Sequence, residues 1–141
     1  MAKKQKSTKK RGAAGGAPQP TALLYKLDEG TPRGDAVRAV LLELGIRVKT
    51  VMPDQVGNPV GALAGLPGFR MTRSPFAGDA PESEFMLLAN MGNAQIDALL
   101  AAMRAADCSV GCKAQVTQHN RLWPFATLVT EVSREHELMN S

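Results

Sequence analysis

The chain has 141 residues, a length that suits one domain with its own hydrophobic core. Two cysteines are too few for a disulfide scaffold, and no apolar stretch approaches the roughly 18 residues that a membrane span needs. The formal net charge is +4, but six of the 17 Lys and Arg residues lie in the first eleven positions, which makes the remainder slightly acidic. We therefore expect a cytoplasmic protein that does not cross a membrane.

Residues 1–20 are predicted to form a disordered basic tail. The segment combines Lys and Arg with Gly, Ala and Pro, and it contains no acidic or aromatic residue. It lacks the apolar segment of a secretory signal. Its positive charge allows weak nucleic-acid contact, but the absence of aromatic side chains for base stacking favours a solubilising extension. Residues 21–141 are expected to form a single α/β domain.

The first half of this domain predicts a strand, a helix, a second strand and a short helix. Thr21–Leu27 is rich in β-forming residues, and Thr31–Leu44 carries apolar residues at helical spacing. A threonine and a proline open this helix, and Gly45 closes it. Arg47–Met52 is the second strand, and Val60–Leu66 predicts one or two helical turns.

The second half repeats this alternation after an irregular segment. Phe69–Glu84 has turn residues and no clear period, so we expect a surface loop. Phe85–Ala89 is apolar throughout, as a strand covered on both faces would be. Asn93 is predicted to cap the next helix, and Lys113–Val116 is the candidate fourth strand.

The final helix is expected to start near Asn120 or Trp123 and to run to about Leu138. Alternating strands and helices favour an α/β fold with a small three- or four-stranded, at least partly parallel sheet and flanking helices. A ferredoxin-like α+β arrangement remains the alternative, because a long connection separates the second and third strands. The residues themselves show no internal repeat. A small sheet leaves an exposed edge, so homodimerisation stays open.

Polar residues follow three of the predicted strands. In a parallel sheet, ligands bind beyond the carboxyl ends of the strands, where loops lead into helices. Capping by Thr117 and Asn120, with packing of the only tryptophan, explains most of the last polar turn without a ligand. We nevertheless take these exits as the place for a site. The candidate binding residues are Lys113, Thr117, His119, Asn120, Trp123, Asn90 and Asp28.

Cofactors and metals are not predicted. Cys108 and Cys112 are spaced C-x3-C with His119 soon after, and this spacing matches neither a standard zinc site nor a redox pair. Small, partly buried cysteines are the favoured interpretation. The sequence also lacks a P-loop, a G-x-G-x-x-G turn and a G-x-S-x-G elbow.

One pattern resembles a known family. The run K-x3-T-x2-N-x2-W from Lys113 to Trp123 is preceded by L-L-A-N-M-G-N-A-Q-I-D-A-L-L-A-A-M-R and followed by Glu135-His136. It is similar to a small bacterial family known as domain of unknown function number 3783. The similarity covers about Ala22 to Leu138. It implies a cytosolic bacterial protein of this size, and it brings no assigned reaction.

The favoured function is a noncatalytic binding or regulatory module that recognises a small molecule or a protein partner at the Thr117–Trp123 corner. The first alternative is an enzyme of unfamiliar type with Lys113 or His119 as acid/base and Asn120 as an orienting group. That alternative predicts that Lys113 and His119 point into a common cleft. The second alternative is nucleic-acid association through residues 1–20.

Overall fold

The computed structural model describes residues 19–139, so the predicted basic tail lies outside the described residues except for its last two positions. Over this range the strands form one mixed sheet in the order β2-β1-β3-β4. No helix in the described range is long and apolar enough to cross a membrane. The elements are β1 (Thr21–Tyr25), α1 (Pro32–Glu43), β2 (Arg47–Val51), η2 (Pro53–Gln55), α2 (Val60–Leu63), β3 (Phe85–Ala89), α3 (Asn93–Ala105), β4 (Lys113–Gln115), η3 (Asn120–Leu122) and α4 (Phe125–Met139).

The sheet confirms the α/β prediction. β1 pairs with β2 in parallel, and β3 pairs with β4 in parallel. Only the central pair, β1 with β3, is antiparallel. The ferredoxin-like alternative is wrong, because it requires antiparallel neighbours throughout the sheet.

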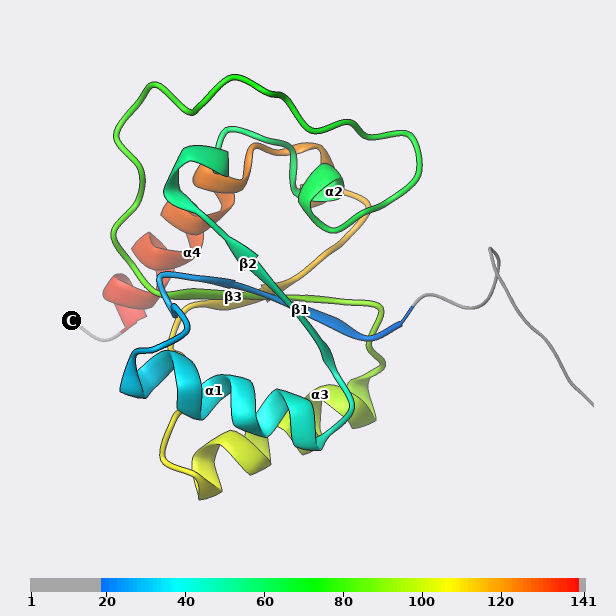
Figure 1. The fold of residues 1–141 in the computed structure, drawn as a ribbon, viewed down its shortest axis with the longest axis vertical. Helices are drawn as coiled ribbons and strands as arrows, with labels where there is room; N and C mark the ends of the chain where they lie inside the picture. The colour runs from blue at the N-terminus through cyan, green and yellow to red at the C-terminus, as the bar shows by residue number, and fades with distance from the viewer. Residues whose placement is uncertain (1–18, 140–141) are drawn as a thin grey trace, which may run out of the picture.

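Helices cover both faces of the sheet (Figure 1). α1 and α3 lie on one face, and α2 and α4 lie on the other. Two apolar clusters fill the spaces between these layers, one around Leu24, Leu41 and Leu99, the other around Leu23, Phe85 and Phe125. Because β1 and β3 are central and covered on both faces, all of their residues are buried. This confirms the prediction made from the apolar run at β3.

The helix starts follow from local side-chain chemistry. The Thr31 hydroxyl accepts a hydrogen bond from the Gly34 amide at 3.0 Å, which caps α1 as predicted. The prediction for α3 is wrong by one residue: Asn93 is the first helical residue, and Gly92 occupies the cap position. The Gln95 side chain accepts from the Gly92 amide instead, so the amide side chain two residues further along replaces the expected cap.

Two β-α-β-α units make up the described chain, and they are related by an approximate two-fold axis. Leu23 and Leu87 hold the same place in β1 and β3, and they are each other's partners across the antiparallel pair. Pro59 and Pro124 precede α2 and α4, and they too pair with each other in an antiparallel bridge. A two-fold axis that passes between the partners of both pairs explains why each of these residues pairs with its own counterpart in the other unit.

Backbone details repeat between the two units. Lys26 after β1 and Asn90 after β3 both have a φ of 62°. Gly45 after α1 and Asp107 after α3 also have positive φ, and the amide of the next residue returns to a carbonyl of the preceding helix in both cases. The shared order of elements was visible in the sequence, but the residues show no repeat because these matching positions carry different residue types.

Candidate functional site

A groove of about 490 Å³ lies between the edge strand β4 and helix α4. The turn that connects these two elements forms one end of it. Small and branched apolar side chains from both elements line its floor, and aromatic, amide and carboxylate groups line its rim. The lining residues are Ala114, Gln115, Thr117, His119, Asn120, Trp123, Leu128, Glu131, Val132 and Glu135.

The connecting turn is held by its own polar side chains. The Asn120 side-chain oxygen accepts from the Thr117 amide at 2.8 Å, and its nitrogen donates to the Gln115 carbonyl at 2.8 Å. The Asn120 amide in turn donates to the Thr117 hydroxyl at 3.0 Å. Asn120 is buried, and these bonds engage both side chains within the turn. Thr117 and Asn120 therefore shape the groove by holding the turn in place.

Two aromatic rings stand at the groove rim. The His119 and Trp123 rings meet edge to face, with centroids 5.4 Å apart and planes at 71°. His119 is exposed and Trp123 is half-buried, so both keep surface available to a bound molecule. Because the Trp123 amide donates to the Asn120 carbonyl, the rigid turn fixes where this indole lies.

The charged side chains that line the groove are acidic. Glu131 and Glu135 are one helical turn apart on α4, and both line the groove. Neither lysine nor arginine is among the lining residues. Arg134 approaches Glu131 at 3.5 Å, but both side chains are exposed and such pairs contribute little. The groove therefore presents negative charge to a ligand.

Lys113 does not belong to this groove. It is on β4, yet it lines a separate cavity on the α3 side with Leu100 and Met103. Its ammonium donates to the Val110 carbonyl at 3.0 Å. Side chains alternate between the faces of a strand, so Ala114 points toward α4 and its neighbour Lys113 points away. The common cleft that the acid/base alternative needs does not exist.

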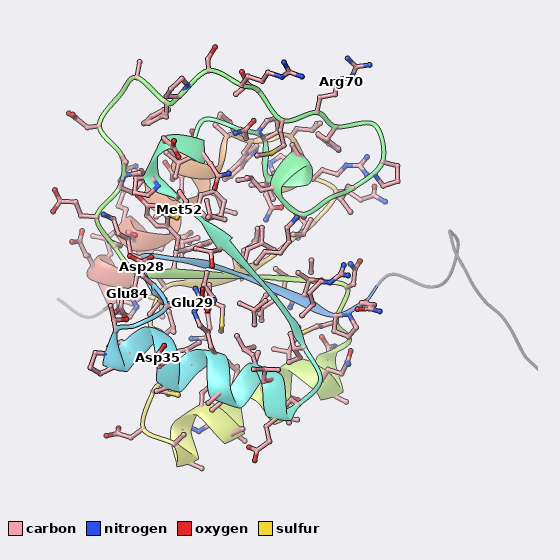
Figure 2. The ribbon with its side chains drawn as sticks, in the orientation of Figure 1. Asp28, Glu29, Asp35, Met52, Arg70 and Glu84 are labelled. Carbon is pink, nitrogen blue, oxygen red and sulfur yellow. The ribbon has the colours of Figure 1, made fainter. Side chains whose placement is uncertain are left out.

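Asn90 and Asp28 lie at opposite ends of the sheet. Asn90 shares a small cavity with Thr117 at the carboxyl ends of β3 and β4, as expected. Asp28 follows β1, which runs antiparallel to β3, so it lies at the end of the sheet where β3 begins (Figure 2). The prediction that Asp28 joins the same rim is wrong because it assumed that all strands point the same way.

Sequence reasoning missed the contribution of α4 to the groove. Leu128 and Val132 are four residues apart, as are Glu131 and Glu135, so an apolar stripe and an acidic stripe run side by side along this helix. This adjacency was readable in the sequence. The small side chain at Ala114, which leaves room for the groove, had no visible signal before the strand was paired.

The two cysteines differ in burial. Cys108 is 2% exposed and Cys112 is half-buried, and both are free thiols. Within residues 19–139, no group of three or more His, Cys, Asp or Glu side chains could hold a metal ion. His136 packs against Gly111, where an added Cβ would lie 2.9 Å from its ring.

We expect the two thiols to differ in reactivity. Burial raises the pKa of the Cys108 thiol, so less of it is thiolate at a given pH, and Arg33 offsets this only in part. Ellman's reagent at pH 8 should therefore modify Cys112 at least ~10-fold faster than Cys108. Variants with Cys108→Ser or Cys112→Ser assign the two phases. Equal rates in the folded protein would contradict the burial of Cys108.

A family comparison adds to this geometry. Residues 84–139 match the family model described as a domain of unknown function, DUF3783. This part of the chain, which is less than half of it, is similar to the DUF3783 family. It comprises β3, α3, β4 and α4, which is the second β-α-β-α unit, and it holds the whole groove. No curated protein and no solved structure matches the chain.

The match confirms the resemblance expected from the K-x3-T-x2-N-x2-W run, which lies inside the matched residues. The matched range is narrower than expected, because it begins at Glu84 and not near Ala22. The boundary falls just before β3, between the two structural units. The matched segment is therefore one half of the two-fold arrangement, and the first half completes the sheet.

Proposed function

We propose that the groove between β4 and α4 is a noncatalytic binding site that recognises a small molecule or one side chain of a protein partner. The observation that carries this proposal is that some groove side chains hold the turn, while others are free to contact a ligand. Its buried polar side chain, Asn120, is used within the turn, whereas the rings, the carboxylates and the apolar floor remain open to a ligand.

The size and lining of the groove support binding. Ligand sites are commonly concave, several hundred Å³ in volume and mostly apolar with a few placed polar groups. Ala114, Leu128 and Val132 line the groove together with the rings of His119 and Trp123. Lys113, one of the two acid/base candidates of the enzyme alternative, faces the other side of the sheet and does not line the groove. Binding is therefore favoured over catalysis.

Trp123 gives a direct test because it is the only tryptophan in the chain. We expect at least one member of a panel of small cations, anions and neutral metabolites to change the Trp123 fluorescence in a saturable way. The indole lines the groove and is half-buried, so a bound molecule changes its surroundings. Titration followed by emission intensity and wavelength measures the effect.

Val132→Phe should weaken any such response at least ~10-fold, because the larger ring fills space on the groove floor. Val48→Phe is the matched control: Val48 is also half-buried, but it lines a cavity beside α1. This second variant should leave the response unchanged. If the full panel gives no response, or if both variants weaken it equally, the groove is not the binding site.

A further inference from the structure

The first β-α-β-α unit contains a counterpart of the groove. Leu23 pairs with Lys49 across β1 and β2, and Leu87 pairs with Ala114 across β3 and β4. Since Leu23 and Leu87 are equivalent about the two-fold axis, Lys49 and Ala114 occupy equivalent positions. A cavity lined by Lys49, Gln55 and Leu63 lies between β2 and α2, where the groove lies between β4 and α4.

The turns that shape the two cavities match as well. Gln55 accepts a hydrogen bond from the amide of Met52 at 2.8 Å, just as Asn120 accepts one from the amide of Thr117. Each side-chain amide holds the backbone three residues earlier and lines its own cavity. The two cavities therefore share one design, and differences between them come from particular side chains.

The main difference is what occupies each cavity. The first-unit cavity measures about 120 Å³, against about 490 Å³ for the groove. In the first unit the Lys49 ammonium donates to the Leu63 carbonyl at 2.7 Å, and Met71 from the long loop also lines the cavity. In the second unit the short side chain of Ala114 leaves the corresponding space open.

The helices also differ at the point where the ammonium lies. α2 ends at Leu63, so the carbonyl of that residue belongs to the last turn, which lacks onward helical partners and is free to accept from Lys49. α4 instead continues to Met139. The Leu128 carbonyl therefore lies inside a regular helix, where it accepts a backbone hydrogen bond from a later residue of the same helix. The continued helix adds Glu131 and Glu135 to the groove wall. Carboxylates thus replace the helix-end carbonyl as acceptors for a cation.

From this internal comparison we propose that the groove binds an alkylammonium group, as carried by a lysine side chain or an aliphatic amine. The ligand supplies in the second unit what Lys49 supplies in the first: an apolar stem along the sheet and an ammonium at the helix. The groove matches this chemistry, with an apolar floor, two carboxylates and the Trp123 ring, on which a cation is favourably placed. This inference rests on the proposed binding function.

Four probes separate the parts of the proposal. Nα-acetyl-lysine amide represents a lysine of a polypeptide, and 1-aminopentane represents a free amine. Nα-acetyl-norleucine amide has the apolar stem without the ammonium, and acetate carries the opposite charge. In Trp123 fluorescence titrations of the full chain, we expect the norleucine probe to bind at least ~5-fold more weakly than the lysine probe. Acetate should leave the Trp123 fluorescence unchanged. Whichever amine binds more tightly identifies the source of the ammonium.

Variants test the two ends of the site. Glu131→Gln combined with Glu135→Gln keeps the shape and removes the charge, so the lysine probe should bind at least ~5-fold more weakly, and its salt dependence should decrease. Glu43→Gln combined with Glu137→Gln is the matched control, since both residues are exposed and outside the groove. Ala114→Lys should insert an internal ammonium, as Lys49 does, and reduce binding at least ~10-fold. Circular dichroism confirms that each variant is folded.

The outcomes distinguish the inference from the proposed function. Equal affinity for the lysine and norleucine probes, or no loss in the Glu131→Gln/Glu135→Gln variant, overturns the alkylammonium assignment. If amines fail but another panel member binds and is weakened by Val132→Phe, the groove is a binding site for a different ligand class. A response to no compound at all removes both claims together.

Discussion

Replacing Phe125 by alanine should lower the free energy of unfolding by about 3–5 kcal/mol, because the change leaves a cavity in the core between the sheet and α4. Phe125 is fully buried. Its ring meets Tyr25 and Phe85 edge to face, with centroids 5.7 and 5.6 Å away. Such a loss is a large part of the total stability expected for a domain of this size. Urea unfolding followed by circular dichroism measures it.

The contrast with Leu122→Ala makes this prediction specific. Leu122 is three residues away and 66% exposed, so its truncation should change the free energy of unfolding by less than about 0.5 kcal/mol. Both variants should keep the wild-type urea dependence, because the surface exposed on unfolding is nearly the same. Similar losses in the two variants would mean that the first turn of α4 is not packed against the sheet as described.

Replacing Asn120 by alanine should lower the free energy of unfolding by about 2 kcal/mol and should also weaken ligand binding. The change removes the side-chain partners of the Thr117 amide and the Gln115 carbonyl at once. The turn that fixes Trp123 then loses its cross-links, so the emission of this residue in the unliganded protein should also shift. Urea unfolding and fluorescence titration on the same sample measure both effects.

Gln55→Ala is the matched variant for this prediction. Gln55 holds the corresponding turn of the first unit through a bond to the Met52 amide, but it lies away from the groove. We expect its loss to cost about 1 kcal/mol and to leave Trp123 and its ligand response unchanged. If Asn120→Ala is as stable as the wild type, water replaces the hydrogen bonds of the Asn120 side chain at no cost. The turn is then not the scaffold of the groove.

The order of elements was predictable from the sequence because each helix and strand has a clear local signal. The apolar run at β3, the threonine and proline at the start of α1 and the glycine after its end all act within a few residues. Some observed helix boundaries differ from the predicted ones. α4, for example, begins after Pro124, and the polar turn before it forms the separate helix η3.

The arrangement of the site was only partly predictable, because strand direction depends on contacts between distant residues. The position of Asp28 was mispredicted for this reason: the antiparallel pairing of β1 with β3 separates the two strand exits. The two-fold repeat was hidden as well. Lys49 and Ala114 have nothing in common as residue types, and their equivalence follows from their shared place opposite Leu23 and Leu87.

Methyl and indole NMR of the full chain, titrated with Nα-acetyl-lysine amide, tests the central claim most directly. We predict saturable shifts at the Ala114, Leu128 and Val132 methyls and at the Trp123 indole, all of which line the groove. The signals of Val48 on β2 and Leu42 on α1, which line a different cavity, should not shift. Shifts that concentrate at those two residues, or that bypass the groove methyls altogether, would contradict the assignment of the site.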